Sequence, residues 1–182
     1  VAVTVRAEGR GQLYVMTSEG TSVTRLVSAE ALDVRAAPSW SPDQKWLAVA
    51  GYEGDERRLF KVPVENGTSV PLISGLVTNP EWAPDGQSIL YRERQGPSFT
   101  VKAVNPDGSP AAIPDLTIGV TGSDGYRFIP GTRSIVALLG DVPVQNFWLV
   151  NLDTGVRRQL TAFKSGHRIR SFDISSKGKQ IL

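Results

Sequence analysis

The sequence predicts an all-β architecture built from a repeated unit of about 45 residues, and three observations carry this prediction. An aromatic or apolar residue followed by a tight turn and a strand recurs along the chain. A glycine turn between two short strands recurs in the intervals. No segment shows the sustained apolar stripe with a period of about 3.6 residues that is typical of an amphipathic helix.

The aromatic landmark is clearest in Trp40-Ser41-Pro42-Asp43 and Trp82-Ala83-Pro84-Asp85-Gly86. Weaker forms begin at Phe128 and Ile174, so the successive spacings are 42, 46 and 46 residues. Proline presets φ at the start of such a turn, and the aspartate side chain caps the backbone two residues further on. The two aspartates are therefore interpreted as turn residues, and the two tryptophans as residues that pack between neighbouring repeats.

The glycine landmark falls at Gly20, Gly67, Gly108 and Gly155, with spacings of 47, 41 and 47 residues. It alternates with the aromatic landmark, so both belong to one unit. A unit of this length containing four short strands is typical of a propeller blade. The sequence thus predicts a β-propeller segment of about four blades, each a four-stranded antiparallel sheet.

The elements can be assigned in order, with the strands of each blade named A to D. The first unit supplies B, C and D, the second supplies all four, and the last supplies A and the start of B. The clearest strands are 1–5, 13–17, 22–27, the strand ending at Trp40, 46–52, 59–64, 69–73, 170–174 and 179–182. The blades are predicted as 1–36 (partial), 37–76, 77–124, 125–168 and 169–182 (partial).

Strand B is supplied twice in this frame, by 1–5 and by 179–182. We therefore expect the chain to be an arc of a larger ring. A homodimer in which two arcs complete one ring is one arrangement that this predicts, since open strand edges favour pairing with another chain.

The Trp-Ser-Pro-Asp motif at Trp40 and the Trp-Ala-Pro-Asp-Gly motif at Trp82 resemble the Trp-Ser-Pro-Asp-Gly repeat of TolB-like, WD-repeat-like β-propellers. Residues 147–155 are similar to the outer half of such a blade. The motif is altered at Gly131-Thr132 and at Ser176-Lys177, which weakens the turn assignment there. This resemblance is specific for fold and weak for function.

Three groups share the repeat. They are periplasmic TolB, which binds partners, the propeller gates of prolyl-oligopeptidase-like and tricorn-like peptidases, and the C-terminal propellers of bacterial signalling kinases. Residues 168–175 are most similar to the third group. The resemblance implies a bacterial protein and a periplasmic or extracytoplasmic location; the residues themselves leave the compartment open.

Composition narrows the function. The 20 Lys and Arg residues and the 18 Asp and Glu residues are scattered and give a net charge of only +2, so we expect no nucleic-acid partner. The chain has no cysteine, which excludes disulfides, thiolate zinc sites and cysteine nucleophiles. No apolar run approaches the length of about 18 residues needed to cross a bilayer, so we expect no membrane insertion by this segment.

Catalytic signals are weak. The only histidine is His167, no Gly-x-Ser-x-Gly motif occurs, and Ser123 in its glycine-flanked stretch is typical of a turn. Asp107 and Asp124 lie in glycine-rich turns without the spacing of a calcium loop. The segment is therefore predicted to be no enzyme by itself and to use neither metal nor cofactor, whereas the full-length protein could carry an enzymatic domain.

Antiparallel strands place the A–B and C–D turns on one face of the propeller and the B–C and D–A connections on the other. The second face is predicted to carry longer, charged loops, where binding residues are commonly found. Among them are 52–58, between strands B and C, and 30–35, between strands D and A. Their mixed charges favour a protein or peptide partner, although such charges can equally serve only to solvate loop tips. The residues proposed for binding are Tyr52, Glu53, Asp55, Glu56, Arg57, Glu93, Arg94, Asp141, His167 and Arg168.

The leading hypothesis is a non-catalytic propeller scaffold for protein–protein interaction or ligand sensing. The first alternative is the gating propeller of a larger hydrolase, such as a prolyl-oligopeptidase-like or tricorn-like peptidase. The second is a carbohydrate-active propeller such as an oligogalacturonide lyase. The single histidine argues weakly against the second alternative.

Overall fold

The computed structural model describes residues 1–28, 30–96, 98–118, 125–140, 144–164, 169 and 171–182. Every regular element in these residues is a strand, as the sequence predicts. The described part of the chain therefore offers no helix able to span a membrane. The chain divides into two compact units, Val1–Glu93 with Ala103–Ala111, and Arg94–Lys102 with Ala112–Leu182. Each unit is considered separately below.

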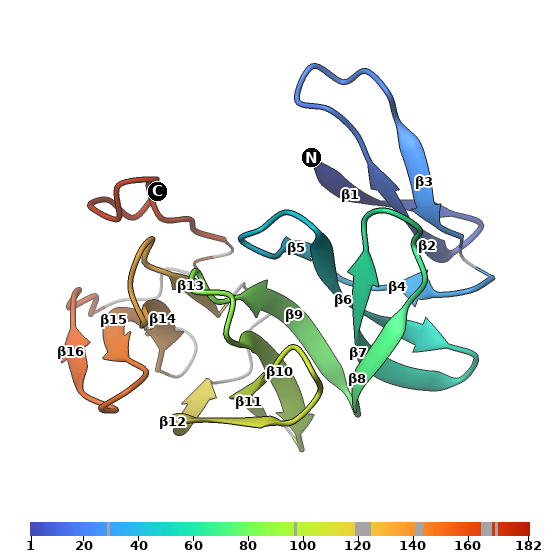
Figure 1. The fold of residues 1–182 in the computed structure, drawn as a ribbon. Helices are drawn as coiled ribbons and strands as arrows, with labels where there is room; N and C mark the ends of the chain where they lie inside the picture. The colour runs from blue at the N-terminus through green and yellow to red at the C-terminus, as the bar shows by residue number, and fades with distance from the viewer. Residues whose placement is uncertain (29, 97, 119–124, 141–143, 165–168, 170) are drawn as a thin grey trace. The chain divides into compact units, whose positions relative to one another are not determined.

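The first unit begins with a three-stranded antiparallel sheet (Figure 1). Its strands are β1 (Ala2–Ala7), β2 (Arg10–Val15) and β3 (Thr24–Val27), in that order. They correspond to the predicted strands B, C and D of the first blade. The β1–β2 connection is a two-residue hairpin, because Ala7 pairs with Arg10. Glu8 and Gly9 both have positive φ, of 51° and 80°, which matches the right-handed twist of the flanking strands.

The second sheet of this unit contains β4 (Asp33–Val34), β5 (Ser39–Trp40), β6 (Trp46–Glu53), β7 (Glu56–Pro63) and β8 (Val70–Ser74). Both β4 and β5 pair with β6, so the predicted strand A consists of two short pieces. Pro38, which has no N–H to donate to a ladder, lies between them. The run Leu47–Ala50 in β6 is fully buried, as expected for a strand covered on both faces.

The third sheet has the order β12-β11-β10-β9, and the boundary between the two units crosses it. Its strands are β9 (Val77–Trp82), β10 (Ile89–Gln95), β11 (Ser98–Val104) and β12 (Pro110–Ile118). The second unit also holds the fourth sheet, whose order is β13-β14-β15-β16. These strands are β13 (Tyr126–Phe128), β14 (Ser134–Leu139), β15 (Asn146–Asn151) and β16 (Arg157–Gln159). The described residues thus form four antiparallel sheets, in agreement with the predicted segment of about four blades, although the first sheet has three strands and the second has five.

The C-terminal strands are less regular than the sequence predicts. In the described part of residues 170–182, Ile174 forms an isolated bridge with Ile181. Asp173 and Leu182 also exchange two backbone hydrogen bonds. The buried Phe172 meets Phe147 of β15 edge to face, with ring centroids 4.9 Å apart. This aromatic contact anchors the C-terminal segment within the second unit.

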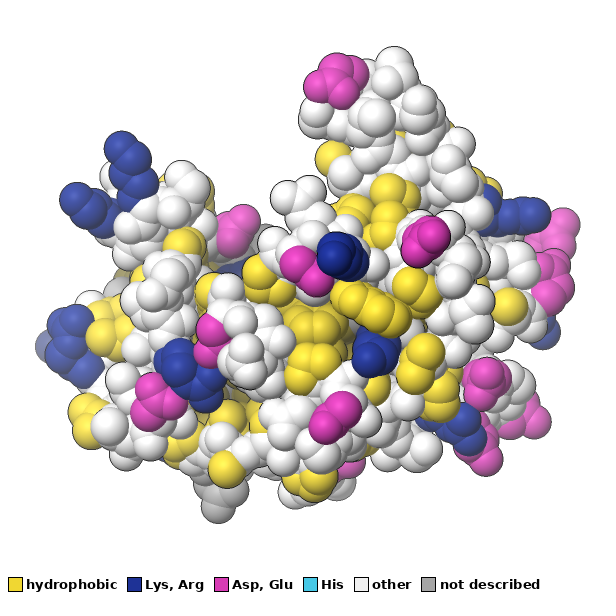
Figure 2. Space-filling view, in the orientation of Figure 1, with side chains coloured by type: hydrophobic (Ala, Val, Ile, Leu, Met, Phe, Trp, Pro, Cys, Tyr) yellow, Lys and Arg dark blue, Asp and Glu magenta, His cyan; other side chains and the backbone are white. Residues whose placement is uncertain are grey.

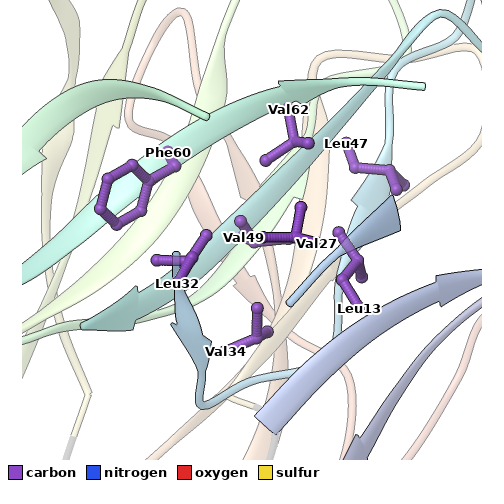
Figure 3. Close-up of a cluster of buried hydrophobic side chains, with 8 residues drawn as sticks. All are labelled: Leu13, Val27, Leu32, Val34, Leu47, Val49, Phe60 and Val62. Atoms are coloured by element: carbon purple, nitrogen blue, oxygen red, sulfur yellow. The ribbon is translucent and has the colours of Figure 1, made fainter. Parts of the chain in front are cut away.

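Two apolar clusters hold the sheets of the first unit together. The first joins β2 and β3 to β4, β6 and β7 (Figure 3), and its members are Leu13, Val27, Leu32, Val34, Leu47, Val49, Phe60 and Val62. Trp40 packs against it. The second cluster joins β6 and β7 to β9 and β10 and contains Trp82. The predicted packing role of both tryptophans is therefore confirmed. Burying each large apolar side chain contributes about 1.5–3 kcal/mol.

The predicted long loop over Tyr52–Arg58 is wrong. Tyr52 pairs with Arg57, and Glu53 pairs with Glu56, so the β6–β7 hairpin has a loop of only two residues. Gly54 supplies the positive φ of 61° that such a tight turn needs. Asp55 therefore lies in the two-residue turn itself. The other charged residues of this region lie at the ends of the two strands, and they are Glu53, Glu56, Arg57 and Arg58.

Candidate binding pocket

A cavity of about 350 Å³ lies in the first unit, and we call it the polar pocket. It gathers residues from the β1–β2 hairpin, the β3–β4 connection and the β6–β7 hairpin. Its lining residues are Arg10, Glu30, Asp33, Arg35, Tyr52, Gly54 and Asp55. These segments are B–C and D–A connections, so the pocket forms at the face where the sequence places its binding residues.

Asp33 forms the base of the polar pocket and is only 8% exposed. Its Oδ1 accepts a 2.7 Å hydrogen bond from the Gly11 backbone N–H, and its Oδ2 accepts one from the Arg35 guanidinium. A Cβ at Gly11 would lie 1.8 Å from the carbonyl oxygen of Val34, so this approach of β2 to β4 requires glycine. The buried carboxylate is thereby satisfied by one cation and one backbone donor, as a buried charge must be.

Tyr52 forms a wall of the pocket and is held by two arginines. The guanidinium carbons of Arg35 and Arg57 each lie 5.6 Å from the centroid of its ring. Arg57 is itself fixed, because its Nε donates to the Val77 carbonyl at 2.8 Å. Cation–π contacts of this kind contribute about 0.5–1 kcal/mol each at partly exposed sites. They orient the ring and occupy its π system.

The rim of the pocket carries exposed charges. The Ser28 hydroxyl, which donates to the Glu30 carboxylate, holds the pKa of Glu30 below its ordinary value, and Arg25 and Arg10 lower it further. Within the described part of the chain, the side chains of Arg10 and Asp55 form neither a hydrogen bond nor an ion pair. The rim thus offers one cation and two carboxylates to solvent.

The other residues proposed for binding lie outside the polar pocket. Glu53 and Glu56 both pair with Arg58, whose Nη1 lies 3.0 Å from Glu53 Oε2. Glu93 and Arg94 lie on β10, and the Nε of Arg94 donates to the Gly96 carbonyl at 3.1 Å. Asp141, His167 and Arg168 lie outside the described residues. The structure therefore brings Tyr52 and Asp55 into the pocket and places Arg57 behind Tyr52.

Sequence analysis placed residues 30–35 in a loop of the predicted binding face but named none of them as binding residues, although Glu30, Asp33 and Arg35 line the pocket. It did not identify Arg10 at all. One signal was available for Asp33, which lies between two apolar residues, Leu32 and Val34, where an acid is unusual. Another was the glycine on each side of Arg10, which fits a tight hairpin followed by a close backbone approach.

A second cavity, of about 310 Å³, lies at the opposite end of β6, and we call it the apolar cleft. It is lined by Ser41, Pro42, Asp43, Trp46, Trp82, Asp85, Gly86 and Pro106. Figure 2 shows hydrophobic side chains at the surface around β5 and β9, with charged side chains at their margin. Lys61 covers the Trp46 ring, with its Nζ 4.7 Å from the centroid, and donates to the Pro106 carbonyl at 2.7 Å.

The aspartates of the apolar cleft serve its turns. Asp43 accepts hydrogen bonds from the Ser41 hydroxyl at 2.6 Å and from the Lys45 N–H at 3.0 Å. These two donors lower the pKa of Asp43. Asp85 accepts from the Gln87 N–H at 2.9 Å. In the described ranges, no three His, Cys, Asp or Glu side chains converge in a way that could hold a metal ion.

Comparison with known proteins gives one similar sequence and several similar folds. No family model matches the chain. An uncharacterized peptidase of Bacillus subtilis, YuxL, is 29% identical over 152 residues, which cover 80% of this chain and 21% of that protein. The chain therefore spans about a fifth of the length of this curated relative.

Solved structures agree on the architecture. TolB from Acinetobacter baumannii has a TM-score of 0.73 at 16% identity, over 99% of this chain and 44% of that one. An oligogalacturonate lyase in complex with manganese has a TM-score of 0.71 at 13% identity, and the match covers 99% of this chain and 54% of the lyase chain. The S511A mutant of puromycin hydrolase, in complex with PGG, has a TM-score of 0.69 at 16% identity, and the match covers 91% of this chain and 28% of the hydrolase chain. At such identities the likeness concerns the fold alone. The four antiparallel sheets, the repeated turns and these neighbours together show that the chain has the fold of a TolB-like β-propeller.

Proposed function

We propose that this chain is a ligand-binding propeller segment of a peptidase-class hydrolase and that it supplies no catalytic group itself. The observation that carries the proposal is the 29% identity to a peptidase over 152 residues. Because the chain matches only 21% of that protein, the proposal assigns peptide-bond cleavage to residues outside the chain. The propeller then contributes binding and admission of substrate.

Two described side chains that could take part in hydrolysis are instead held in structural hydrogen bonds. A serine hydrolase needs a nucleophile within hydrogen-bond reach of a base that a third group orients. Ser41 instead donates to Asp43 and accepts from the Trp46 N–H, which makes it a turn residue. The buried Asp33 is bound by Arg35 and by a backbone N–H. Neither arrangement generates a nucleophile.

The test uses the 182-residue chain and the natural polypeptide that contains it. A fluorophosphonate probe, which labels activated serines, is applied to both, and hydrolysis of aminoacyl and peptidyl p-nitroanilides is followed. We expect labelling and turnover by the natural polypeptide and neither by the 182-residue chain. Labelling of the chain alone would overturn its non-catalytic role, and an inert natural polypeptide would overturn the hydrolase assignment.

A second candidate is the scaffold or sensing role predicted from the sequence, and the polar pocket favours it. A pocket with an unpaired cation and an unpaired carboxylate can recognise a partner whether or not a hydrolase is attached. Under this proposal a protein or peptide partner docks on the face formed by the hairpins β1–β2 and β6–β7. Association of two copies into one ring is part of the same proposal. Light scattering tests it, since a dimer has twice the 19.7 kDa of a monomer.

A further inference from the structure

We infer that the polar pocket binds a small zwitterion, namely a free amino acid or a very short peptide that presents one ammonium group and one carboxylate. The inference does not depend on the hydrolase proposal, because it rests on the charges and dimensions of the pocket. Its elements are a neutralised ion pair at the base, a fixed aromatic wall, and rim charges of both signs within one cavity.

The base of the pocket does not select the ligand. Asp33 and Arg35 neutralise each other, and the second oxygen of Asp33 is occupied by the Gly11 N–H. A ligand charge that displaced Arg35 would leave the carboxylate of Asp33 buried and without its cation, which is costly. These two residues therefore fix the shape of the cavity and leave recognition to the rim.

The rim selects by charge. Arg10 presents a guanidinium whose planar donors suit a carboxylate, and Asp55 presents a carboxylate that suits an ammonium group. An anion without a positive group would face Glu30 and Asp55 as well as Arg10. A cation without a negative group would face Arg10. A ligand that carries both charges can pair its carboxylate with Arg10 and its ammonium group with Asp55, and the attraction of Glu30 and Asp55 for the ammonium group offsets their repulsion of the carboxylate.

Size and the aromatic wall limit the ligand further. A volume of about 350 Å³ is near the lower end of small-molecule pockets, which start at about 300 Å³, so one or two small residues fit. The hydroxyl of Tyr52 forms no hydrogen bond with another described residue. Because Arg35 and Arg57 hold the ring in place and Tyr52 lines the pocket, we expect its hydroxyl to donate to the carbonyl of a single peptide bond.

The experiment measures binding of three probes to the 182-residue chain by calorimetry or NMR titration: alanyl-alanine, its N-acetyl form and its C-terminal amide. We expect the free dipeptide to bind and each blocked form to bind about tenfold more weakly, since each loses one charge-assisted contact. Asp55→Asn should weaken binding of the free dipeptide by the same factor, and the variant should bind the free and the N-acetylated dipeptide equally well. Arg10→Gln should also weaken binding of the free dipeptide by this factor, and this variant should bind the free and the C-terminally amidated dipeptide equally well.

Two matched variants serve as controls. Glu65→Gln removes an exposed carboxylate from the first unit outside the pocket, and Arg158→Gln removes an exposed guanidinium from the second unit. Neither should change the affinity. Equal binding of all three probes, or equal loss in the control variants, would overturn the inference, and so would failure of the free dipeptide to bind. The blocked probes test the native chain directly, so a variant that unfolds does not remove the test, and fluorophosphonate labelling reports on the hydrolase proposal separately.

Discussion

The two ends of strand β6 are built for different purposes. Trp46 begins the strand in the apolar cleft, and Tyr52 lies near its other end in the polar pocket. At the cleft, proline turns are closed by aspartates that accept hydrogen bonds from their own turn. At the pocket, Arg10 begins β2 and Asp55 lies in the β6–β7 turn. Neither side chain forms a hydrogen bond or an ion pair with another described residue, although the charge of Arg10 acts on Glu30. A carboxylate already satisfied by its own turn serves the fold, whereas an unpaired one is available to a ligand.

The largest expected effect comes from breaking the base of the polar pocket. Gly11→Ala would place a Cβ 1.8 Å from the Val34 carbonyl oxygen, so β2 and β4 would have to separate. We expect the free energy of unfolding to fall by about 3 kcal/mol, measured by urea denaturation. Gly9→Ala is the control. A Cβ at Gly9 would meet nothing within 4 Å, so only the positive φ of 80° destabilises this variant, and we expect its free energy of unfolding to fall by about 1 kcal/mol. Equal losses in both variants would show that the approach of the two strands is unimportant.

The next effect separates the two bonds of Asp33. Asp33→Ala leaves the Gly11 N–H and the Arg35 guanidinium without their acceptor, and we expect a loss of about 2 kcal/mol in the free energy of unfolding. Asp33→Asn keeps one oxygen for the Gly11 N–H but removes the charge and the acceptor of Arg35, which is exposed and can turn to solvent, so about 1 kcal/mol is expected. Urea denaturation of both variants measures the difference. A costlier asparagine than alanine would contradict this account of the buried carboxylate.

A smaller effect comes from exchanging residues between two equivalent turns of the apolar cleft. Ser41 donates to Asp43 and accepts from the Trp46 N–H at 2.9 Å, whereas Ala83 holds the equivalent position in the next repeat. We expect Ser41→Ala to lower the free energy of unfolding by about 1 kcal/mol. Ala83→Ser should change it by less than about 0.5 kcal/mol, because a hydrogen bond from the new hydroxyl to Asp85 would offset the cost of burying that hydroxyl at a position that is 1% exposed. Thermal denaturation compares the two, and a larger loss for Ala83→Ser would show that the turns are not equivalent.

The same contrast explains how much the sequence alone could predict. The turns at the apolar cleft were predictable, because Trp-Ser-Pro-Asp and Pro-Asp-Gly are local motifs in which the aspartate caps its own backbone. The pocket was only partly predictable. Tyr52 and Asp55 were identified from their place between two strands, but the hairpin proved tighter than expected, since Gly54 lets the ladder extend to Glu53 and Glu56.

Contacts between distant segments escaped prediction for a physical reason. Asp33 meets Gly11 across 22 residues, and the contact depends on how the first two sheets of the first unit pack together. No local motif encodes that packing. The same holds for Arg57, whose anchoring to the Val77 carbonyl could not be inferred from its charge.

The smallest expected effect is the pH dependence that Asp43, in the apolar cleft, gives to the free energy of unfolding. The Ser41 hydroxyl and the Lys45 N–H hold the pKa of Asp43 below its ordinary value of 3.8. Because the folded pKa is lower than the unfolded one, the carboxylate stabilises the fold above about pH 4, and this contribution is lost as the pH falls through the folded pKa. Ser41→Ala should move the pKa of Asp43 back towards 3.8, as followed by NMR titration of the side-chain carboxyl. The pKa of Asp107, which the Ser109 hydroxyl lowers in a separate turn, should stay where it is. If the pKa values of both residues shifted together, a general electrostatic change would set them and a local hydrogen bond would not. That result would remove the distinction between carboxylates that accept hydrogen bonds within their own turn and carboxylates that are available to a ligand.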